Sequence, residues 1–539
     1  MINHSTNSTT SCEPAFPFYW QGSSSPDILT ADTLSSALRN FSASLYILTN
    51  GEATYLVSTG TLSLNGSWKV LAFLPPFLPE SLGDAGFKNT YGTRYALYGG
   101  SMANGIASEE MVIALGRAGF MGSFGAGGLS PARVEKAIQT IRDSLPGQPY
   151  AFNLINSPFE PALEQHTAEL YVNYNVPVIE ASAYLGLTSN LVLYRATGLS
   201  TAPDGAPKIG HRIIAKVSRK EVASKFLSPA PMEMLNQLVA DHKITPEQAA
   251  LARLVPMADD ITVEADSGGH TDNRPLVSLM PVMLHLRDSY QEKFHYLQPV
   301  RVGAAGGIST PESTIAAFMI GAAYVTTGSI NQSCLESATS EHTRNLLAQI
   351  EMTDVTMAPA SDMFEMGVKV QVVKRGTMFA MRAQKLYDLY QKYDSIDDIP
   401  ADEREKLEST IFKASLDEIW QECLTFFGER DPKQIDRANQ KPKDKMALIF
   451  RWYLGLSSRW SNTGEKGREM DYQIWCGPSM GAFNDWVRGT YLESSARRHV
   501  AEVNRQLLDG AAYLFRVRQL EAQGVRIPET VRAFIPRED

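Results

Sequence analysis

The sequence has few cysteines, and they are not arranged to bind a metal ion. Its four cysteines, Cys12, Cys334, Cys423 and Cys476, lie far apart. No two of them form a CxxC pair or share a Cys/His spacing typical of zinc ligands. We therefore expect four free thiols in a reducing compartment and no metal site.

The sequence also lacks the long apolar runs and the basic excess that mark other classes of protein. No stretch of about eighteen apolar residues occurs, which argues against a transmembrane helix. The formal net charge of −9 disfavours nucleic acid as the main partner and leaves no polybasic tail for a membrane surface. The polar N-terminus has no apolar signal core, so we expect a cytoplasmic protein.

The length of 539 residues predicts two to four domains, or fewer if one is a large barrel. Residues 1–85 form an N-terminal segment in which apolar and β-branched residues flank Asn50-Gly51, the signal of a β-hairpin. Residues 86–335 alternate short apolar runs with helical patterns. Residues 336–539 are predicted to be a mostly helical C-terminal domain.

Eight short apolar runs in the central region predict the strands of a TIM (β/α)8 barrel. Strands of a parallel sheet are buried on both faces and so are continuously apolar, as these runs are. The runs are 95–100, 120–125, 150–156, 176–182, 212–217, 261–265, 300–307 and 323–329. An open, doubly wound sheet is the alternative architecture, which the count of eight disfavours.

One connection is much longer than the others. Residues 218–258, between the fifth and sixth strands, contain two helical patterns, the second with Thr245 as N-cap and Pro246 in the first position. So long an excursion at a barrel loop is more often functional than idle. We expect this helical insertion to form a wall or lid of the substrate site.

The active site of a TIM barrel lies at the carboxyl ends of its strands, which selects candidate residues from distant parts of the chain. The sixth strand runs into Glu264–His270, where a glycine pair lets the backbone approach a flat ligand and the histidine can exchange a proton near neutral pH. The other candidates follow strands one, three, five, seven and eight: Ser101, Met102, Ala103, Asn104, Asn153, Lys216, Gly306, Gly307, Gly328 and Ser329.

Glycines after strands seven and eight predict a phosphate site. The loops after these two strands commonly bind phosphate in TIM barrels through backbone N–H groups and a helix N-terminus. Gly306-Gly307 precedes a helix start at Thr310-Pro311, and Gly328-Ser329 occupies the next loop. The pattern therefore favours a phosphate-bearing cofactor over a pair of simple turns.

Residues 95–331 resemble the superfamily of FMN-dependent nitronate monooxygenases and flavin enoyl reductases. The resemblance is carried by Glu264–His270, Ser101–Gly105, Ala305–Ile308 and Gly328-Ser329. Three further stretches resemble the PfaD family, the trans-acting enoyl reductases of polyketide and polyunsaturated fatty acid synthases. These stretches are Phe18–Gly22, Lys374–Arg382 and Asp471–Asn484.

This resemblance implies an FMN enzyme that uses NADPH to reduce the 2,3 double bond of an enoyl thioester on an acyl carrier protein. It implies that His270 donates a proton or a hydrogen bond to the substrate, and that Gly268, Gly269, Asn153 and Lys216 border the flavin. A structural role for His270, and an ion pair of Lys216 with Glu180 or Glu264, are the alternatives.

Two other functions stay open at this point. The chain could be a nitronate monooxygenase-like flavin oxidase, although such an enzyme has no need of the insertion or of a large C-terminal domain. It could also be a non-catalytic flavin-binding scaffold in a synthase complex. The oligomeric state, including a homodimer, and the choice between NADPH and NADH are not determined by any motif.

Overall fold

We describe a computed structural model in which residues 18–158 and 160–538 are placed. The described residues divide into two compact units, one formed by residues 18–82 and 505–537 and the other by residues 83–158, 160–504 and 538. The last segment of the chain thus belongs with the N-terminal segment. The sequence-based boundaries at residues 85 and 335 stay a prediction.

The first unit contains an antiparallel sheet and the C-terminal part of helix α20 (Val500–Ala522). Its six strands follow the order β2-β4-β3-β6-β1-β5, with bounds Asp27–Ile28, Thr54–Val57, Leu45–Thr49, Trp68–Leu74, Tyr19–Gln21 and Thr61–Ser63. The expected hairpin is confirmed as β3 and β4, which pair from Thr49↔Thr54 on either side of Gly51 at φ +95°. Beside the sheet, buried Arg516 donates to the carbonyls of Leu38, Asn40 and Ala43 at the end of α1 (Ala31–Arg39).

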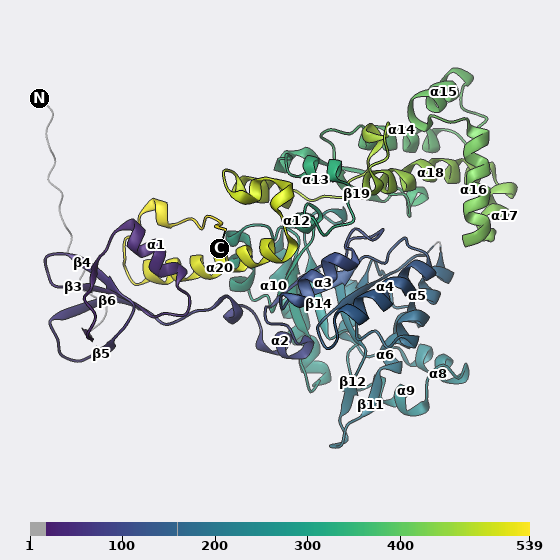
Figure 1. The fold of residues 1–539 in the computed structure, drawn as a ribbon. Coiled ribbons are helices and arrows are strands. Elements are labelled where there is room, and N and C mark those ends of the chain that lie inside the picture. Colours follow the sequence, from purple (N-terminus) through teal and green to yellow (C-terminus); the bar gives the residue numbers. More distant parts are fainter. Residues whose placement is uncertain (1–17, 159, 539) are drawn as a thin grey trace, which may run out of the picture. The chain divides into compact units, whose positions relative to one another are not determined.

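The second unit is built on a closed barrel of eight parallel strands, so the predicted TIM barrel is confirmed (Figure 1). Each of the eight predicted runs overlaps one barrel strand. In chain order the strands are β7 (Leu97–Gly99), β8 (Met121–Phe124), β9 (Ala151–Ile155), β10 (Val178–Ser182), β13 (Arg212–Val217), β14 (Asp260–Glu264), β16 (Arg301–Ala305) and β17 (Val325–Thr327).

Helices separate consecutive barrel strands. They are α3 (Glu109–Arg117), α4 (Pro131–Ser144), α5 (Pro161–Asn173), α6 (Ser189–Thr197), α7 (Lys220–Leu227), α10 (Leu276–Phe294) and α11 (Pro311–Ile320). The amino end of the barrel is filled by α2 (Ala85–Tyr91), whose Phe87 and Tyr91 pack with Tyr98 and Tyr324 in a buried aromatic cluster. This end is therefore packed with side chains, and the carboxyl ends of the strands are left for a site.

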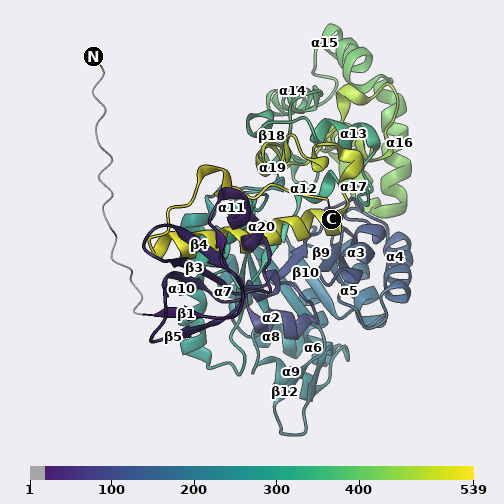
Figure 2. The ribbon, with the colours of Figure 1, turned by 60° about the vertical axis from the view of Figure 1, so that its left-hand side comes forward.

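The helical insertion is present, but its expected role as a lid of the site is wrong. After α7 the chain forms α8 (Met232–Ala240) and α9 (Pro246–Ala252) and then enters the amino end of β14. Helix α9 contacts the hairpin β11 (Leu199–Thr201) and β12 (Pro207–Ile209), where Thr201 donates to Glu247 at 2.7 Å. Figures 1 and 2 show these elements at the end of the barrel away from residues 379–463.

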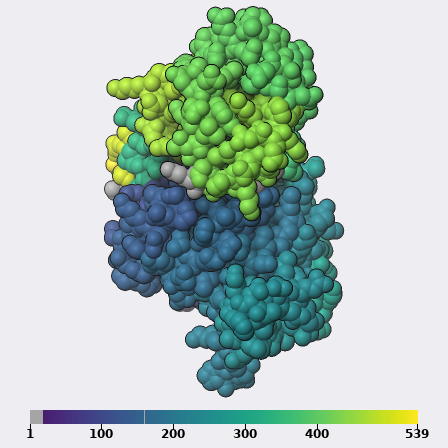
Figure 3. All heavy atoms as spheres, turned by 90° about the vertical axis from the view of Figure 1, so that its right-hand side faces the viewer, coloured from purple at the N-terminus to yellow at the C-terminus, as the bar shows by residue number. Residues whose placement is uncertain are grey.

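The region after the barrel covers the carboxyl ends of the strands. Strands β18 (Val355–Pro359) and β19 (Lys369–Val373) form a small sheet, followed by a bundle of helices (green in Figure 3) against the blue part of the barrel. The bundle consists of α14 (Phe379–Lys392), α15 (Ala401–Lys406), α16 (Leu416–Arg430), α17 (Pro432–Gln440) and α18 (Pro442–Thr463). The mostly helical character predicted for this region is confirmed.

Two expectations about the rest of the chain can be compared with the structure. Cys334, Cys423 and Cys476 are free and buried, and Cys12 lies outside the described residues. Within residues 18–158 and 160–538, no helix is both long and apolar enough to cross a bilayer.

Candidate active site at the carboxyl ends of the barrel strands

His270 lies on a short strand that pairs with a strand from beyond the barrel. Gly269 and His270 form β15, which is antiparallel to β19, with His270 opposite Val370. The Nε2 atom of His270 lies 2.9 Å from Oδ2 of Asp362, and about a third of its side chain (32%) is exposed. His270 is therefore held in place by Val370 and Asp362, both of which lie far from it in the sequence.

The surroundings of His270 favour its protonated form. Desolvation lowers the pKa of the imidazole, but the hydrogen bond to Asp362 and the charges of Asp362 and Glu264 outweigh it, so that the pKa is raised. The same contact lowers the pKa of Asp362 against the effect of its own desolvation. A histidine that must carry a proton near neutral pH to act as an acid catalyst needs a raised pKa of this kind.

Gly268 makes a close contact that the sequence did not reveal. A Cβ atom on this residue would come within 2.8 Å of the backbone N and Cα of Cys476. The next residue, Gly477, donates its N–H to Oγ of Ser329 at 3.0 Å. The segment around Cys476-Gly477 thus joins the loop after β14 to the loop after β17. The missing side chain of Gly268 leaves room for the backbone of Cys476, and not only for a flat ligand.

A buried ionic network lies at the mouth of the barrel. The Nζ atom of Lys216 is 2.9 Å from Oε1 of Glu264 and 3.5 Å from Oε1 of Glu180, whose side chain is fully buried. Ser101 donates to Glu180 from its hydroxyl at 2.7 Å and from its N–H at 3.1 Å. Burial lowers the pKa of Lys216, but the two carboxylates outweigh this effect and raise it, so that the lysine stays charged.

The remaining candidates from strands one and three border the same region. Asn153 is buried and donates from Nδ2 to the Glu180 carbonyl at 3.1 Å and to Ser182 Oγ at 3.0 Å. Asn104, in the left-handed conformation at φ +58°, donates to Ser458 Oγ of α18 at 2.8 Å. Met102 and Ala103 lie between Ser101 and Asn104 on the loop after β7 and are half-buried. The first loop therefore reaches both the barrel mouth and the helical bundle.

Two of the glycines after β16 and β17, Gly307 and Gly328, border open space. Gly306 and Gly307 have φ values of +81° and +76°, which favour glycine. A Cβ atom on Gly306 would come within 2.7 Å of the Ala265 backbone, whereas one on Gly307 or Gly328 would meet no heavy atom within 4 Å.

Nearby, the buried hydroxyl of Ser267 has no hydrogen-bond partner among the residues that the structure describes. Open backbone positions after β16 and β17, together with an unsatisfied buried hydroxyl, fit the phosphate end of a flavin nucleotide. The FMN predicted from the sequence is therefore compatible with these residues.

The structure brings most of the predicted site residues to one end of the barrel. It adds Asp362, Gln371 and the segment Cys476-Gly477, which local sequence patterns did not select. The ion pair of Lys216 that the sequence left as an alternative is present, with both Glu180 and Glu264. Gln371 donates from Nε2 to Asp266 Oδ1 at 2.7 Å and to the Ser267 carbonyl at 2.8 Å, and so fixes the loop before His270. Of these residues, only Cys476 and Gly477 had a sequence signal, because they lie in the stretch Asp471–Asn484 that resembles a family motif.

Two family models match the chain. Residues 88–386 match the model described as nitronate monooxygenase. Residues 393–472 match the model described as the inserted helical domain of [acyl-carrier-protein] S-malonyltransferase, and this range covers most of the helical bundle.

Curated relatives share about half of their aligned residues with the chain. A subunit of the polyunsaturated fatty acid synthase of Thraustochytrium sp. (strain ATCC 26185 / S-3) is 50% identical over 446 residues, which are 81% of this chain and 30% of that protein. Polyketide biosynthesis protein PksE of Bacillus subtilis (strain 168) is 49% identical over 440 residues, 81% of this chain and 57% of PksE. The chain therefore spans from under a third to just over half of these relatives.

One solved structure is similar over almost its whole length. The enoyl reductase domain of MlnA, from the macrolactin biosynthesis cluster of Bacillus amyloliquefaciens, is 39% identical with a TM-score of 0.78. The similarity covers 82% of this chain and 99% of that domain.

Proposed function

This chain belongs to the nitronate monooxygenase family, and we propose that it is a cytoplasmic, FMN-dependent enoyl reductase that acts in trans on polyketide or polyunsaturated fatty acid synthases. Its substrate would be an enoyl thioester on an acyl carrier protein, reduced at the 2,3 double bond. The observation that carries the proposal is the similarity to the MlnA enoyl reductase domain, which extends over 99% of that domain.

The proposed cofactor site uses the loops at the carboxyl ends of the strands. Gly306, Gly307, Gly328 and Ser329 would hold the FMN phosphate, since Gly307 and Gly328 border open space and the other two adjoin them in the chain. The residues Ser101, Met102, Ala103, Asn104, Asn153, Lys216, Gly268 and Gly269 would border the rest of the flavin. Bound FMN, reduced by NADPH, would supply the hydride for the β-carbon of the substrate.

The protein itself would orient the substrate and manage a proton. Because Nε2 of His270 is hydrogen-bonded to Asp362, Nδ1 is the ring nitrogen that would donate to the substrate. A protonated His270 would donate to the thioester carbonyl or deliver the proton to the α-carbon. Lys216, held between Glu180 and Glu264, would present a fixed positive charge to the cofactor side of the barrel mouth.

The helical bundle supports an acyl carrier protein as the partner. The family model that matches residues 393–472 is described as the inserted helical domain of an [acyl-carrier-protein] S-malonyltransferase. That name describes an enzyme that acts on an acyl carrier protein, and a reductase that also acts on carrier proteins would share such a domain. The position of the bundle over the carboxyl ends of the strands fits the same role.

Two measurements test the proposal. The purified protein is expected to show flavin absorbance near one equivalent and to oxidise NADPH when an enoyl group on a carrier protein is added. Absence of flavin would overturn the cofactor, and rapid oxygen uptake with a nitronate but no enoyl reduction would favour an oxidase. Unchanged reduction in His270→Ala would remove His270 from the mechanism, and bound flavin without any enoyl reduction by the purified protein would favour the scaffold hypothesis.

A further inference from the structure

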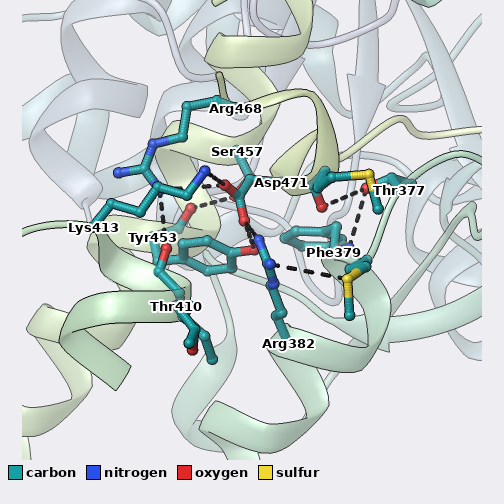
Figure 4. A network of polar contacts seen from close by, with 12 residues as sticks. Thr377, Phe379, Arg382, Thr410, Lys413, Tyr453, Ser457, Arg468 and Asp471 are labelled. Atoms are coloured by element: carbon teal, nitrogen blue, oxygen red, sulfur yellow. Dashed lines mark hydrogen bonds and ion pairs between the residues drawn. The ribbon is translucent and has the colours of Figure 1, made fainter. Parts of the chain in front are cut away.

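The helical bundle over the barrel mouth has a hydrophobic core of its own. Buried side chains from α14, α16 and α18 pack together in this core with β18 and β19. Asp471 ties two of the helices to each other, because it is fully buried and accepts hydrogen bonds from Arg382 of α14 and from the Tyr453 hydroxyl of α18 (Figure 4). The bundle is thus one packed body, and its position on the barrel depends on the contacts between the two.

Two polar contacts of the bundle reach the loop after β7, one directly and one through a neighbouring loop. Asn104 on this loop donates from Nδ2 to Oγ of Ser458 on α18 at 2.8 Å. Arg430, the last residue of α16, donates from Nη1 to the carbonyl of Gly128 at 3.4 Å. Gly128 lies against Asn104, since a Cβ atom on it would come within 2.2 Å of Oδ1 of Asn104. Both contacts therefore act on residues 101–105, the flavin loop, four of which are assigned to the cofactor.

Arg430 also holds the loop after β9 through an ion pair. Its Nε and Nη2 atoms lie 3.0 and 2.7 Å from Oε2 of Glu160, the residue that precedes α5. The side chains of Arg430 and Glu160 are 23% and 16% exposed, and the guanidinium lies 5.2 Å from the centre of the Phe426 ring. Because both charges are largely shielded from water, breaking this pair costs more than breaking an exposed surface ion pair.

The two segments that Arg430 binds form walls of a small cavity at the barrel mouth. Gly128 lines one side of it, and the first turn of α5, which begins directly after Glu160, lines it with Glu164. Asn153, which is assigned to the border of the flavin, lies in the same cavity. Arg430 thus fixes two segments of the proposed cofactor site relative to each other.

We propose that Arg430 is a positioning residue for the reduction. By binding Glu160 and the carbonyl of Gly128, it keeps the helical bundle closed on the flavin loop and holds that loop beside Asn153. This inference rests on the proposed function. The reduction needs flavin and substrate in a fixed geometry, and a displacement of about 1 Å can lower the rate about 100-fold. Because Arg430 acts through the segments that it binds, its loss is expected to lower kcat more than it weakens substrate binding.

The first test reverses the charge of Arg430. We measure kcat and KM of the full-length flavoprotein with NADPH and crotonyl N-acetylcysteamine. In Arg430→Glu two carboxylates face each other, and the bundle loses its attachment to the loops after β8 and β9. We expect kcat to fall at least about ten-fold, while KM for the thioester changes by less than about three-fold.

Hydrogen exchange gives a second readout, which does not depend on turnover. The N–H of Asn104 donates to the carbonyl of Gly127 at 2.7 Å, and that of Gly105 to the carbonyl of Gly125 at 2.9 Å. Both bonds join the flavin loop to the loop that Arg430 holds. In Arg430→Glu we expect both amides to exchange at least about ten-fold faster, with FMN bound and in the apoprotein.

Three further variants separate the ion pair from the substitution itself. Adding Glu160→Arg to Arg430→Glu restores opposite charges and is expected to raise kcat at least about five-fold above that of Arg430→Glu. Arg430→Gln removes the charge without repulsion, is expected to change kcat and exchange in the same direction, and serves if Arg430→Glu does not fold. Lys385→Glu reverses a charge in another ion pair of the bundle, between α14 and Glu403 of α15. It is expected to leave kcat and the exchange of Asn104 unchanged.

Several results would overturn this role of Arg430. Unchanged kcat or unchanged exchange of Asn104 in Arg430→Glu is one of them. An equal fall of kcat in Lys385→Glu would make the effect one of bundle stability, and a double variant without recovery would show that Glu160 is not the partner that matters. If the unsubstituted protein reduces no enoyl thioester, the proposed function fails, and the exchange of Asn104 and Gly105 still decides whether Arg430 holds the flavin loop.

Discussion

Gly268 and Cys476 lie backbone against backbone, and a Cβ atom on Gly268 would come within 2.8 Å of the N and Cα atoms of Cys476. The contact joins the loop that carries His270 to a segment more than 200 residues later in the chain. Because the clash is with backbone and not with the end of a flexible side chain, neither segment can yield without moving its loop.

Gly268→Ala is therefore expected to destabilise the site. Overpacking of this kind costs about 1–3 kcal/mol. We expect a lower midpoint in denaturant unfolding and weaker retention of flavin. A variant as stable as the unsubstituted protein, with full flavin occupancy, would show that the loop moves freely and that the contact is not needed.

Gly328→Ala separates cofactor binding from stability. Gly328 has a negative φ of −135°, and a Cβ atom there would meet no protein atom within 4 Å. We expect unfolding at the same denaturant concentration but a raised dissociation constant for FMN, because the added methyl enters the space assigned to the phosphate. Equal FMN affinity, measured by fluorescence titration of the apoprotein, would move the phosphate elsewhere.

Asp362→Asn tests the role assigned to the His270–Asp362 pair. Asp362 raises the pKa of His270, so its loss is expected to lower that pKa. If protonated His270 is required, the fall of kcat with rising pH should begin at lower pH in the variant. Protonated His270 also stabilises the fold at pH values below the pKa that it has in the unfolded chain. This contribution is lost as the pH rises through the pKa of His270 in the folded protein.

The control for this prediction is Asp354→Asn. Asp354 pairs with Arg375 at 3.2 Å, away from His270, and its substitution should leave the pH profile in place. Identical pH profiles in Asp362→Asn and the unsubstituted enzyme would contradict a catalytic function for the pair. Titration of the His270 ring by NMR reports its pKa independently of turnover.

Lys216→Met would leave Glu180 and Glu264 without their shared cation. Breaking a buried ion pair by removing one partner typically costs about 3–5 kcal/mol, and Glu180 is fully buried. We expect a large loss of unfolding free energy near neutral pH and a smaller one in acid, where the carboxylates are protonated. Lys216→Arg keeps the charge and should retain most of the stability. An unchanged unfolding midpoint in Lys216→Met would contradict this interpretation of the network.

Much of the architecture followed from local patterns. The eight strands were recognisable because parallel strands buried on both faces need continuous apolar side chains, whatever their neighbours are. The glycine pair after strand seven was recognisable because positive φ values at Gly306 and Gly307 restrict the residue type. Assigning loops to the carboxyl ends of the strands then brought Ser101, Lys216 and His270 together.

The insertion shows where a local pattern was insufficient. Its two helices were identified correctly, but α7 already serves as the crossover after β13. Helices α8 and α9 lead into the start of β14 and so lie at the amino end of the barrel, opposite the site. Connections that enter a strand and connections that leave it face opposite ends of a barrel, and the spacing alone does not distinguish them.

The sequence by itself determined the barrel, the loops at its carboxyl end and the position of His270 after the sixth strand. Only the tertiary structure decided which groups surround that histidine. Asp362, Val370 and Cys476 reach its loop through strand pairing and close backbone contact across long sequence separations. Such contacts depend on how distant segments pack, and no periodicity or motif within either segment encodes them.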